Sequence, residues 1–195
     1  MSKVDMTIEI CGMSGDGTIA AGGLLNEAMS RAGFSILAFD SYPAEIRGFG
    51  RCVTRSRVGD EEMLALNDEI HVLISLDDEQ SLSRIPRLAE NATVFFDNKP
   101  PAYVGEGHTI AAHVEPGVNL FGMPFAELAT AAAGTTRGRN LTALGGFAGV
   151  LGVPPKPFYE AIQKKFSPKG ERCWRPTSRV LNPVIDTPWM NSMVG

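Results

Sequence analysis

A glycine-rich segment near the N-terminus carries the residue types that bind phosphate or another anion. Gly12, Gly15 and Gly17 follow the spacing G-x-x-G-x-G. Ser14 and Asp16 lie between them. Glycines that turn a strand into a helix leave backbone N–H groups free at the helix N-terminus, where the helix dipole also attracts anions. The segment therefore indicates a nucleotide- or phosphate-binding geometry.

The spacing matches neither of the two common nucleotide motifs. The dinucleotide motif is G-x-G-x-x-G, and a P-loop has Lys-Ser or Lys-Thr after its last glycine, where this chain has Thr18. Asp16 also places a carboxylate where a phosphate would lie, although its side chain is able to cap the helix instead. The alternative interpretation is a tight turn whose glycines only allow the helix to pack closely on the sheet.

The same glycines also resemble the start of a thiamine-diphosphate motif, Gly15-Asp16-Gly17. That motif needs an Asn pair further along the chain to help hold magnesium. Residues 41–45, which occupy that place, read Ser-Tyr-Pro-Ala-Glu. We therefore expect no thiamine site on this chain.

Several arginines follow within a short distance. Arg51, Arg55 and Arg57 alternate along a predicted strand and so share one face, and Arg47 and Gly48 come just before it. Guanidinium groups bind carboxylates and phosphates through two parallel hydrogen bonds, which suggests an anion site. A solvated face of an edge strand, protected from aggregation by its charges, explains the pattern equally well. A contact with a partner subunit is a third interpretation.

Other residues that often do chemistry are not arranged for it. The histidines lie in or beside apolar strands, without a carboxylate at ligand spacing, at His71, His108 and His113. A nucleophile motif G-x-S-x-G does not occur. The cysteines are odd in number and scattered, at Cys11, Cys52 and Cys173. They predict reduced thiols in a cytosolic protein and exclude an iron–sulfur or structural zinc ligand set within this chain alone. We expect neither a catalytic residue nor a metal site here.

The elements that position these residues follow an α/β pattern. Alternating or continuous apolar runs predict strands at 6–10, 35–39, 51–58, 71–76, 93–97 and 108–114. Apolar residues at helical spacing predict helices at 18–32, 77–88, 125–133, 140–152 and 156–166. Gly33 supplies a left-handed stop for the first helix, and acidic residues open the second.

Composition limits the class of protein. The chain has 195 residues, 44% of them hydrophobic and 21% charged, and a net charge of −4. These values are typical of a soluble globular protein and argue against a general nucleic-acid-binding surface. No apolar run approaches the roughly 20 residues of a membrane span, and the N-terminus lacks the apolar core of a secretory signal. We expect one α/β domain over residues 1–170 and a cytoplasmic location.

The C-terminal part differs in character. Residues 171–195 contain both tryptophans and several prolines, with little periodicity. Such a segment does not belong inside a compact domain, and exposed tryptophans are a liability in a free tail. We predict an extended arm that uses its aromatic residues as anchors on another subunit. The alternative is an arm that wraps its own domain.

Three separated blocks resemble one known family. They are the loop Gly12–Gly17 with its helix, residues 41–50 (Ser-Tyr-Pro-Ala-Glu-Ile-Arg-Gly-Phe-Gly) and residues 140–152. In order and separation they are similar to the gamma subunit, or gamma domain, of 2-oxoacid:ferredoxin oxidoreductases. Residues 121–129 and 158–170 look like further family segments, so the resemblance covers about residues 5–171. The family loop usually reads G-x-G-G-Q-G; here Ser14 replaces a glycine and Asp16 replaces the glutamine. Its R-G-G becomes Arg47-Gly48-Phe49.

The resemblance implies a three-layer α/β/α domain with a mostly parallel central sheet, a variant of the Rossmann fold. It implies an accessory subunit of an enzyme that oxidatively decarboxylates a 2-oxoacid to its acyl-coenzyme A. Thiamine diphosphate, Mg and 4Fe-4S clusters then belong to alpha-, beta- and delta-type partner subunits, and ferredoxin or another acceptor meets those partners. Coenzyme A is the co-substrate. The implied anion contacts are Gly12, Ser14, Gly15, Asp16, Gly17, Arg47, Gly48 and Arg51.

Two other functions fit the same sequence. One is a stand-alone nucleotide- or flavin-binding enzyme with a Rossmann-like sheet, which would carry its own cofactor. The other is a purely structural assembly subunit whose glycine loop binds nothing. The sequence does not name the 2-oxoacid or the electron acceptor.

Overall fold

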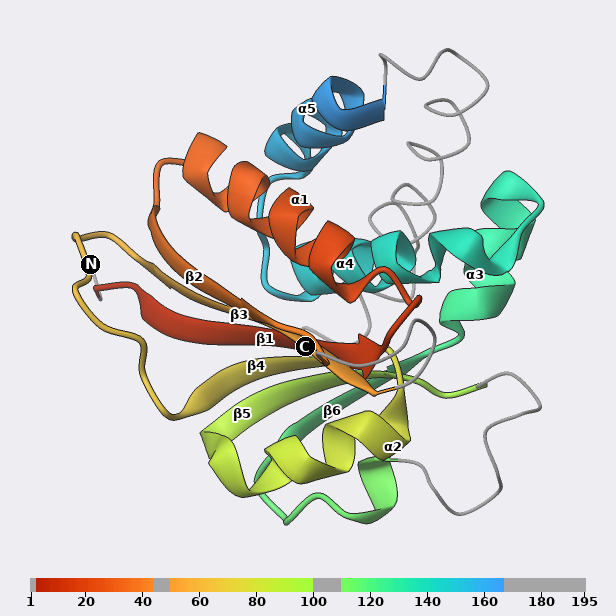
Figure 1. Ribbon diagram of the computed structural model, residues 1–195, viewed down its shortest axis with the longest axis horizontal. Coiled ribbons are helices and arrows are strands. Elements are labelled where there is room, and N and C mark those ends of the chain that lie inside the picture. The colour runs from red at the N-terminus through yellow and green to blue at the C-terminus, as the bar shows by residue number, and fades with distance from the viewer. Residues whose placement is uncertain (1–2, 44–49, 100–109, 167–195) are drawn as a thin grey trace.

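The architecture is one mixed sheet with helices on both faces (Figure 1). It comes from a computed structural model that describes residues 3–43, 50–99 and 110–166. The strands are β1 (Asp5–Met13), β2 (Ser35–Ser41), β3 (Arg51–Gly59), β4 (Ile70–Ser75), β5 (Leu88–Asp97) and β6 (Asn119–Met123). They lie in the order β2-β3-β1-β4-β5-β6.

The sheet is mostly parallel, as predicted. β1 pairs in parallel with β4, β4 with β5, and β5 with β6. β3 is antiparallel to both of its neighbours, β1 and β2. Among the described strands, β3 alone therefore runs against the rest. The carboxyl ends of β1, β4, β5 and β6 meet at one edge of the sheet, where α/β folds usually place their ligands.

Helices form a thick layer on one face and a thin layer on the other, which confirms the three-layer prediction. The helices are α1 (Thr18–Arg31), α2 (Asp78–Ser81), α3 (Phe125–Ala133), α4 (Arg139–Val150) and α5 (Pro155–Phe166), with short 3-10 helices η1 (Leu82–Arg87), η2 (Ile110–Ala112) and η3 (Thr136–Gly138). In Figure 1, α1, α4 and α5 cover one face, and α2 lies on the other. None of the helices described here has the length and apolar character needed to cross a membrane.

The core follows this asymmetry. The larger cluster fills the space between the sheet and the thick layer, and in it Phe147 makes edge contacts with Phe95 and Phe158 at centroid distances of 6.4 and 6.5 Å. The smaller cluster lies on the opposite face, around Leu73 and Ile110. Most of the apolar stabilisation therefore comes from the side of α1, α4 and α5.

Several predicted elements are confirmed, and two are wrong. The helix predicted at 125–133 has those bounds as α3, and Gly33 has the predicted positive φ, 97°. The helix predicted at 77–88 ends at Ser81 and continues as the 3-10 helix η1, which contains Pro86. Proline removes a helical hydrogen bond and clashes with the preceding turn.

The strand predicted at 108–114 is also wrong. Its described part forms the 3-10 helix η2, and the last strand is β6, which the prediction missed. The predicted arm at 171–195 and the domain boundary at 170 lie outside the described residues.

The packing of α1 on the sheet depends on one glycine. Gly22 faces Thr54 of β3, and a Cβ added at Gly22 would lie 2.3 Å from Thr54 Cγ2. The Thr54 hydroxyl is fixed because it donates a hydrogen bond to Asp40 at 2.8 Å. The next residue, Gly23, is exposed, and a Cβ there would meet only Lys165 Nζ at 3.8 Å.

These two neighbouring glycines give a matched pair of variants. We expect Gly22→Ala to lower the free energy of unfolding by about 1–3 kcal/mol, because the added methyl group overpacks the helix–sheet contact. Gly23→Ala should raise it by roughly 0.5–1 kcal/mol, because alanine favours the helix. Urea unfolding of both variants measures the difference. Equal effects of the two substitutions would contradict the close approach of α1 to β3.

Candidate functional site

The glycine loop joins β1 to α1 at the carboxyl edge of the sheet. Gly15 and Gly17 have φ angles of 107° and 80°, a left-handed conformation that favours glycine. A Cβ on Gly17 would also lie 2.4 Å from Nδ2 of Asn140, which donates a hydrogen bond to the Gly17 carbonyl oxygen at 3.1 Å. A Cβ on Gly12 would lie 2.8 Å from Thr18 Oγ1. Gly12 and Gly17 therefore serve close packing, whereas Gly15 has open space around its Cα and serves the turn through its positive φ.

Asp16 binds within its own loop. Its Oδ2 accepts a hydrogen bond from the Met13 backbone N–H at 2.9 Å, and its own N–H donates to the Met13 carbonyl at 3.1 Å. No side chain in the described part of the chain caps the N-terminus of α1, so the helix-cap interpretation of Asp16 is wrong. Burial raises the pKa of Asp16, and the positive charge of Arg139, 3.6 Å away, acts in the opposite direction. A carboxylate thus occupies the loop where an anion was expected.

Two further carboxylates lie at the same edge. Asp78, at the start of α2, accepts hydrogen bonds from the Ser75 hydroxyl at 2.6 Å and from the Ile110 N–H at 2.9 Å. Asp97, at the end of β5, accepts one from the Lys99 N–H at 3.1 Å. Burial raises the pKa of both carboxyl groups.

Arg139 is the cation that these carboxylates share. It begins α4, and its guanidinium donates a hydrogen bond to the Leu76 carbonyl oxygen at the end of β4. Its positive charge offsets part of the effect of burial on Asp16, Asp78 and Asp97, although the pKa of each carboxyl group stays above its ordinary value. The carboxyl edge of the sheet, where nucleotide-binding folds hold their ligand, is therefore lined by carboxylates. Their partners are Arg139 and backbone groups of the same chain.

Sequence reasoning missed Arg139, Asp78 and Asp97. The signal for the two carboxylates was their position directly after apolar strands, where the ends of parallel strands meet. Arg139 precedes the block at 140–152 and carried no signal of its own.

Arg51 is brought next to the glycine loop. The Ser14 N–H donates to the Gly50 carbonyl at 3.0 Å, and Arg51 stands opposite Met13 in the β1–β3 register. Arg51 is exposed, and its Nη1 donates to the Ser83 hydroxyl at 2.6 Å. Ser14 and Arg51 thus form the outer rim of the loop. The predicted residues Arg47 and Gly48 lie outside the described residues.

The arginines of β3 share one face as predicted, but β3 is not an edge strand, because β2 pairs with its other side. Arg57 makes two hydrogen bonds to Asp5, at 2.8 and 2.7 Å. Arg55 donates to the buried Glu9 at 2.8 Å. Both side chains therefore bind carboxylates of β1. Arg51 has no carboxylate partner among the described residues, which makes it the candidate contact for a small-molecule anion on this strand.

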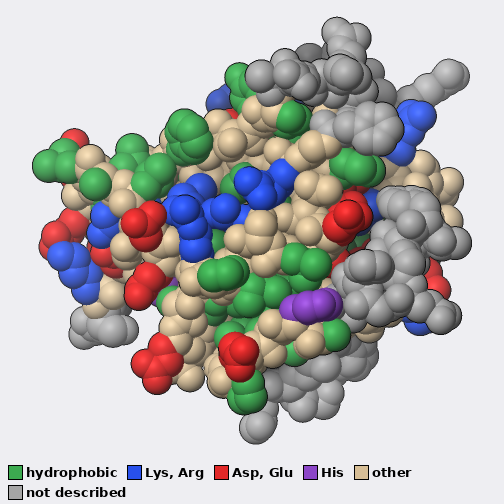
Figure 2. All heavy atoms as spheres, turned by 60° about the horizontal axis from the view of Figure 1, so that its bottom comes forward, with side chains coloured by type: hydrophobic (Ala, Val, Ile, Leu, Met, Phe, Trp, Pro, Cys, Tyr) green, Lys and Arg blue, Asp and Glu red, His purple; other side chains and the backbone are tan. Residues whose placement is uncertain are grey.

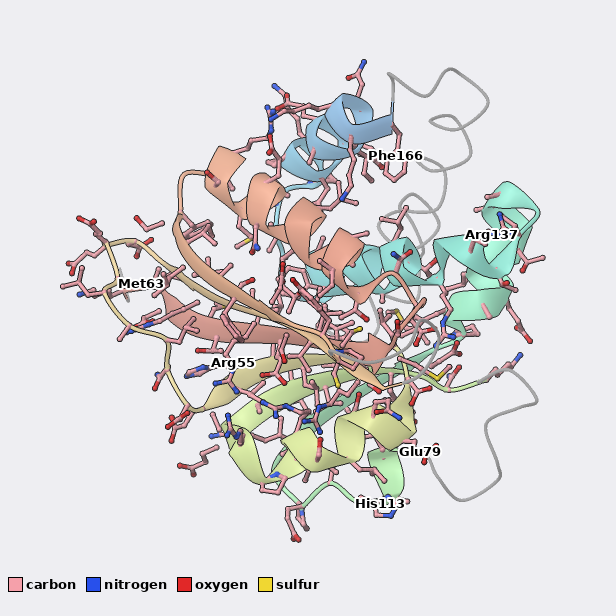
Figure 3. The ribbon with its side chains drawn as sticks, viewed as in Figure 1. Arg55, Met63, Glu79, His113, Arg137 and Phe166 are labelled. Atoms are coloured by element: carbon pink, nitrogen blue, oxygen red, sulfur yellow. The ribbon has the colours of Figure 1, made fainter. Side chains whose placement is uncertain are left out.

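A groove of about 230 Å³ runs over this face, which we call the basic groove. It is lined by Glu9, Phe39, Ser41, Arg51, Val53, Arg55, Leu66, Arg84 and Arg87. Figure 2, in which the α2 side of the molecule comes forward, shows basic side chains gathered in a band with hydrophobic side chains beside it. In Figure 3, Arg55 lies beside the sheet on this side.

The remaining candidates have structural surroundings. His71 Nδ1 accepts a hydrogen bond from the Thr7 N–H at 3.0 Å, across the β1–β4 pair. Burial raises the pKa of Cys11 to about 12 and also raises that of Cys52, so both are unreactive thiols at neutral pH. His108 and Cys173 lie outside the described residues.

Comparison with known proteins finds matches to most of the chain. Residues 7–176 match the family model described as pyruvate ferredoxin/flavodoxin oxidoreductase. The 2-oxoglutarate synthase subunit KorC of Archaeoglobus fulgidus is 29% identical over 163 residues, which cover 83% of this chain and 79% of that protein.

Solved structures share the fold. The pyruvate oxidoreductase subunit PORC of Thermotoga maritima is 21% identical, with a TM-score of 0.76 and coverage of 95% of this chain and 97% of that one. The gamma subunit of a keto/oxoacid ferredoxin oxidoreductase from Geobacter sulfurreducens is 20% identical, with a TM-score of 0.71 and coverage of 93% and 96%.

A longer chain contains the same fold. The 2-oxoglutarate:ferredoxin oxidoreductase of Magnetococcus marinus, solved with 2-oxoglutarate, coenzyme A and succinyl-CoA bound, is 21% identical with a TM-score of 0.81. The match covers 94% of this chain but spans only 31% of that one. Because the family model matches most of the sequence, the chain belongs to the pyruvate ferredoxin/flavodoxin oxidoreductase family, in agreement with the resemblance found in the sequence.

Proposed function

We propose that this chain is the non-catalytic gamma subunit of a multisubunit, thiamine-diphosphate-dependent 2-oxoacid:acceptor oxidoreductase. The enzyme oxidatively decarboxylates a 2-oxoacid and transfers the acyl group to coenzyme A. The observation that carries the proposal is the family match over residues 7–176, which extends through the whole described domain. A cytoplasmic location is part of the same proposal.

The cofactors belong to partner subunits in this proposal. Thiamine diphosphate with Mg and the 4Fe-4S clusters are held by alpha-, beta- and delta-type chains, which also meet ferredoxin or another acceptor. The carboxyl edge of this chain supports that division, since Asp16, Asp78 and Asp97 fill it with negative charge that repels a phosphate-bearing cofactor.

This chain contributes to the coenzyme A side of the site through the rim of the glycine loop. Asp16 already accepts the Met13 N–H, so the inner part of the loop is closed to an anion. The rim differs, because Arg51 is exposed and pairs only with a neutral hydroxyl among the described residues. A guanidinium in that position suits a phosphate or carboxylate of the co-substrate. Arg47 and Gly48 precede this rim in sequence and belong to the same proposed contact.

A purely structural role remains the second candidate. The contact between Asn140 and Gly17 favours it, because it uses the loop for packing between α1 and α4. The two roles differ in what a substitution at Arg51 does to catalysis and to assembly.

A pull-down of the tagged chain from its native host tests the proposed function. We expect subunits with a thiamine motif and C-x-x-C iron–sulfur motifs to co-purify in fixed stoichiometry, identified by mass spectrometry. The purified assembly should oxidise a 2-oxoacid only when coenzyme A is present. A chain that came down alone with a bound flavin or nicotinamide would instead support the stand-alone enzyme.

Arg51→Gln tests the ligand role in the assembled enzyme. We expect the KM for coenzyme A to rise about tenfold, since a hydrogen bond to a charged group contributes roughly 1.5–3 kcal/mol. The control is Arg57→Gln, on the same face of β3 but about 20 Å along the strand and paired with Asp5. Intact assembly with an unchanged KM would exclude the ligand role, and loss of assembly would favour the structural role.

The pH dependence of stability tests the buried carboxylate. Burial raises the folded-state pKa of Asp16 above the ordinary value of 3.8, so the folded protein binds this proton more tightly than the unfolded chain. The charge therefore destabilises the fold as the pH rises above that value. We expect Asp16→Asn to resemble the wild type near pH 4 and to exceed its melting temperature increasingly toward pH 7, measured by calorimetry.

Glu27→Gln is a control of opposite sign. Hydrogen bonds from Lys164 and Arg31 lower the pKa of Glu27, so its stabilisation is present above the ordinary value of 4.5 and lost in acid. That variant should be less stable than the wild type at pH 7 and similar to it in acid. A pH-independent difference between Asp16→Asn and the wild type would contradict the burial of the charge.

A further inference from the structure

The basic groove carries more positive charge than the described chain neutralises. Its one acidic lining residue, Glu9, is fully buried. Both carboxylate oxygens of Glu9 are already bound. Oε2 accepts hydrogen bonds from Arg55 Nε at 2.8 Å and from Arg84 Nη2 at 3.0 Å, and Oε1 accepts one from Arg84 Nε. Two guanidinium groups thus share one carboxylate, which leaves an excess positive charge in a largely desolvated position.

Arg55 shows that this neutralisation is incomplete. The residue is 8% exposed, and its Nη2 is buried without a hydrogen-bond partner among the described residues. A buried donor without a partner costs free energy, and such groups are rare in folded proteins. Its Nη1 binds the neutral Asn67 carbonyl oxygen at 3.0 Å and lies 3.9 Å from a carboxylate oxygen of the exposed Asp68.

The other two arginines add to the excess. Arg51 binds the neutral hydroxyl of Ser83, and Arg87 lies 3.8 Å from a carboxylate oxygen of Asp68. The Asp68 side chain is 98% exposed, so water screens its charge and the pair contributes little. The groove is therefore strongly positive in a protein whose net charge is −4.

The rim of the groove is apolar. Phe39, on β2, is 59% exposed, and Leu66 is 37% exposed. Both line the groove together with the buried Val53. Arginine and exposed aromatic residues side by side are the composition of protein–protein contact sites rather than of solvated surface.

We propose that the basic groove docks an acidic segment of a partner subunit, with an Asp or Glu side chain inserted beside Arg55, Arg84 and Arg87 and an apolar neighbour packed on Phe39. Arg51, at the end of the groove next to the glycine loop, is left to coenzyme A. The proposal rests on the proposed function only in naming the partner as a subunit of the same oxidoreductase. The inserted carboxylate supplies the negative charge that the Arg55–Glu9–Arg84 cluster lacks.

The geometry favours a carboxylate of a protein over the phosphate of a small molecule. Phosphate sites usually use free backbone N–H groups at a helix N-terminus or in a glycine turn. The floor of the groove is instead formed by β1 and β3, whose backbones pair with each other from Asp5 to Met13. The described cations of the groove are arginine side chains, and the planar guanidinium fork matches a planar carboxylate.

The test uses the complete complex, made by co-expressing the chain with the oxidoreductase subunits. The variant is Arg87→Glu combined with Phe39→Ser, which alters two exposed lining residues outside the proposed coenzyme A contact. We expect the affinity of the chain for its partners to fall by roughly tenfold or more. Wild-type binding should also weaken between about 50 and 500 mM NaCl, because salt screens exposed charges.

The matched control is Lys156→Glu combined with Leu151→Ser. It also reverses one exposed cation and removes one exposed apolar side chain, but near α5 on the opposite side of the sheet. We expect wild-type affinity from it. Circular dichroism of both variants checks that they fold.

The outcomes separate the two proposals. A wild-type chain that recovers no oxidoreductase subunits would overturn the proposed function and, with it, the named partner. If the wild-type complex forms and the Arg87→Glu/Phe39→Ser variant assembles equally well, the docking proposal alone is overturned. A raised KM for coenzyme A in that variant, with assembly unchanged, would assign the groove to a small-molecule anion instead.

A second variant locates the partner residue directly. Arg87→Lys keeps the positive charge and introduces an amine that a carbodiimide couples to a carboxylate in contact. We expect a cross-link to an Asp or Glu of a partner subunit, identified by mass spectrometry and absent from the wild type. A complex that forms normally but gives no such cross-link would contradict insertion of the carboxylate beside this position.

Discussion

The contact between α4 and the glycine loop is the constraint on which the site depends. Asn140 binds the carbonyl of Gly17, and Arg139 lies against Asp16, so two consecutive residues hold a loop that is more than 120 residues earlier in the chain. Arg139 also reaches the end of β4 through the Leu76 carbonyl. One helix start thus fixes the ends of β1 and β4 together, and the buried carboxylates at that edge are tolerable only because this cation is there.

The antiparallel strand β3 gives the molecule two different sides. Its even-numbered residues, such as Thr54, face α1 and allow the close approach at Gly22. Its odd-numbered residues carry the arginines toward the thin layer, where Glu9 of β1 binds Arg55 and Asp5 of β1 binds Arg57. The Ser14–Gly50 hydrogen bond connects the start of this strand to the loop. Loop rim and basic groove are therefore parts of one continuous surface.

The sequence predicted the elements whose pattern is local. Alternating residues marked β1, helical spacing and Gly33 marked α1, and the bounds of α3 were correct. β6 was missed because it is short and contains Gly122, a residue that is unfavourable in strands. Glycine is needed at this position because a Cβ would lie 2.8 Å from the ring of Phe96 on the neighbouring strand. The 3-10 continuation of α2 follows from Pro86. This local signal was present in the sequence, but the prediction gave more weight to the acidic residues that start the helix.

The site was predictable only where its parts are adjacent in sequence. The loop glycines and the shared face of the β3 arginines were visible, but the position of β3 inside the sheet was not. Arg139, Asp78 and Asp97 come from different elements and meet only through the parallel order of β1, β4 and β5. The role of Asp16 depends on the Met13 N–H and on Arg139, so its identity alone did not distinguish a cap from a loop ligand.

The place of β3 between β1 and β2 has a consequence for biosynthesis. During translation β1 emerges first, but its antiparallel neighbour is complete only at Gly59 and its parallel neighbour only at Ser75. The residues that close the glycine loop emerge later still, with α4. Contacts so distant in sequence form slowly, and an unpaired apolar strand is prone to aggregate meanwhile. The nascent chain therefore leaves both edges of β1 unpaired until β3 has been synthesised and one edge unpaired until β4 follows, and this is the interval in which a chaperone would bind it.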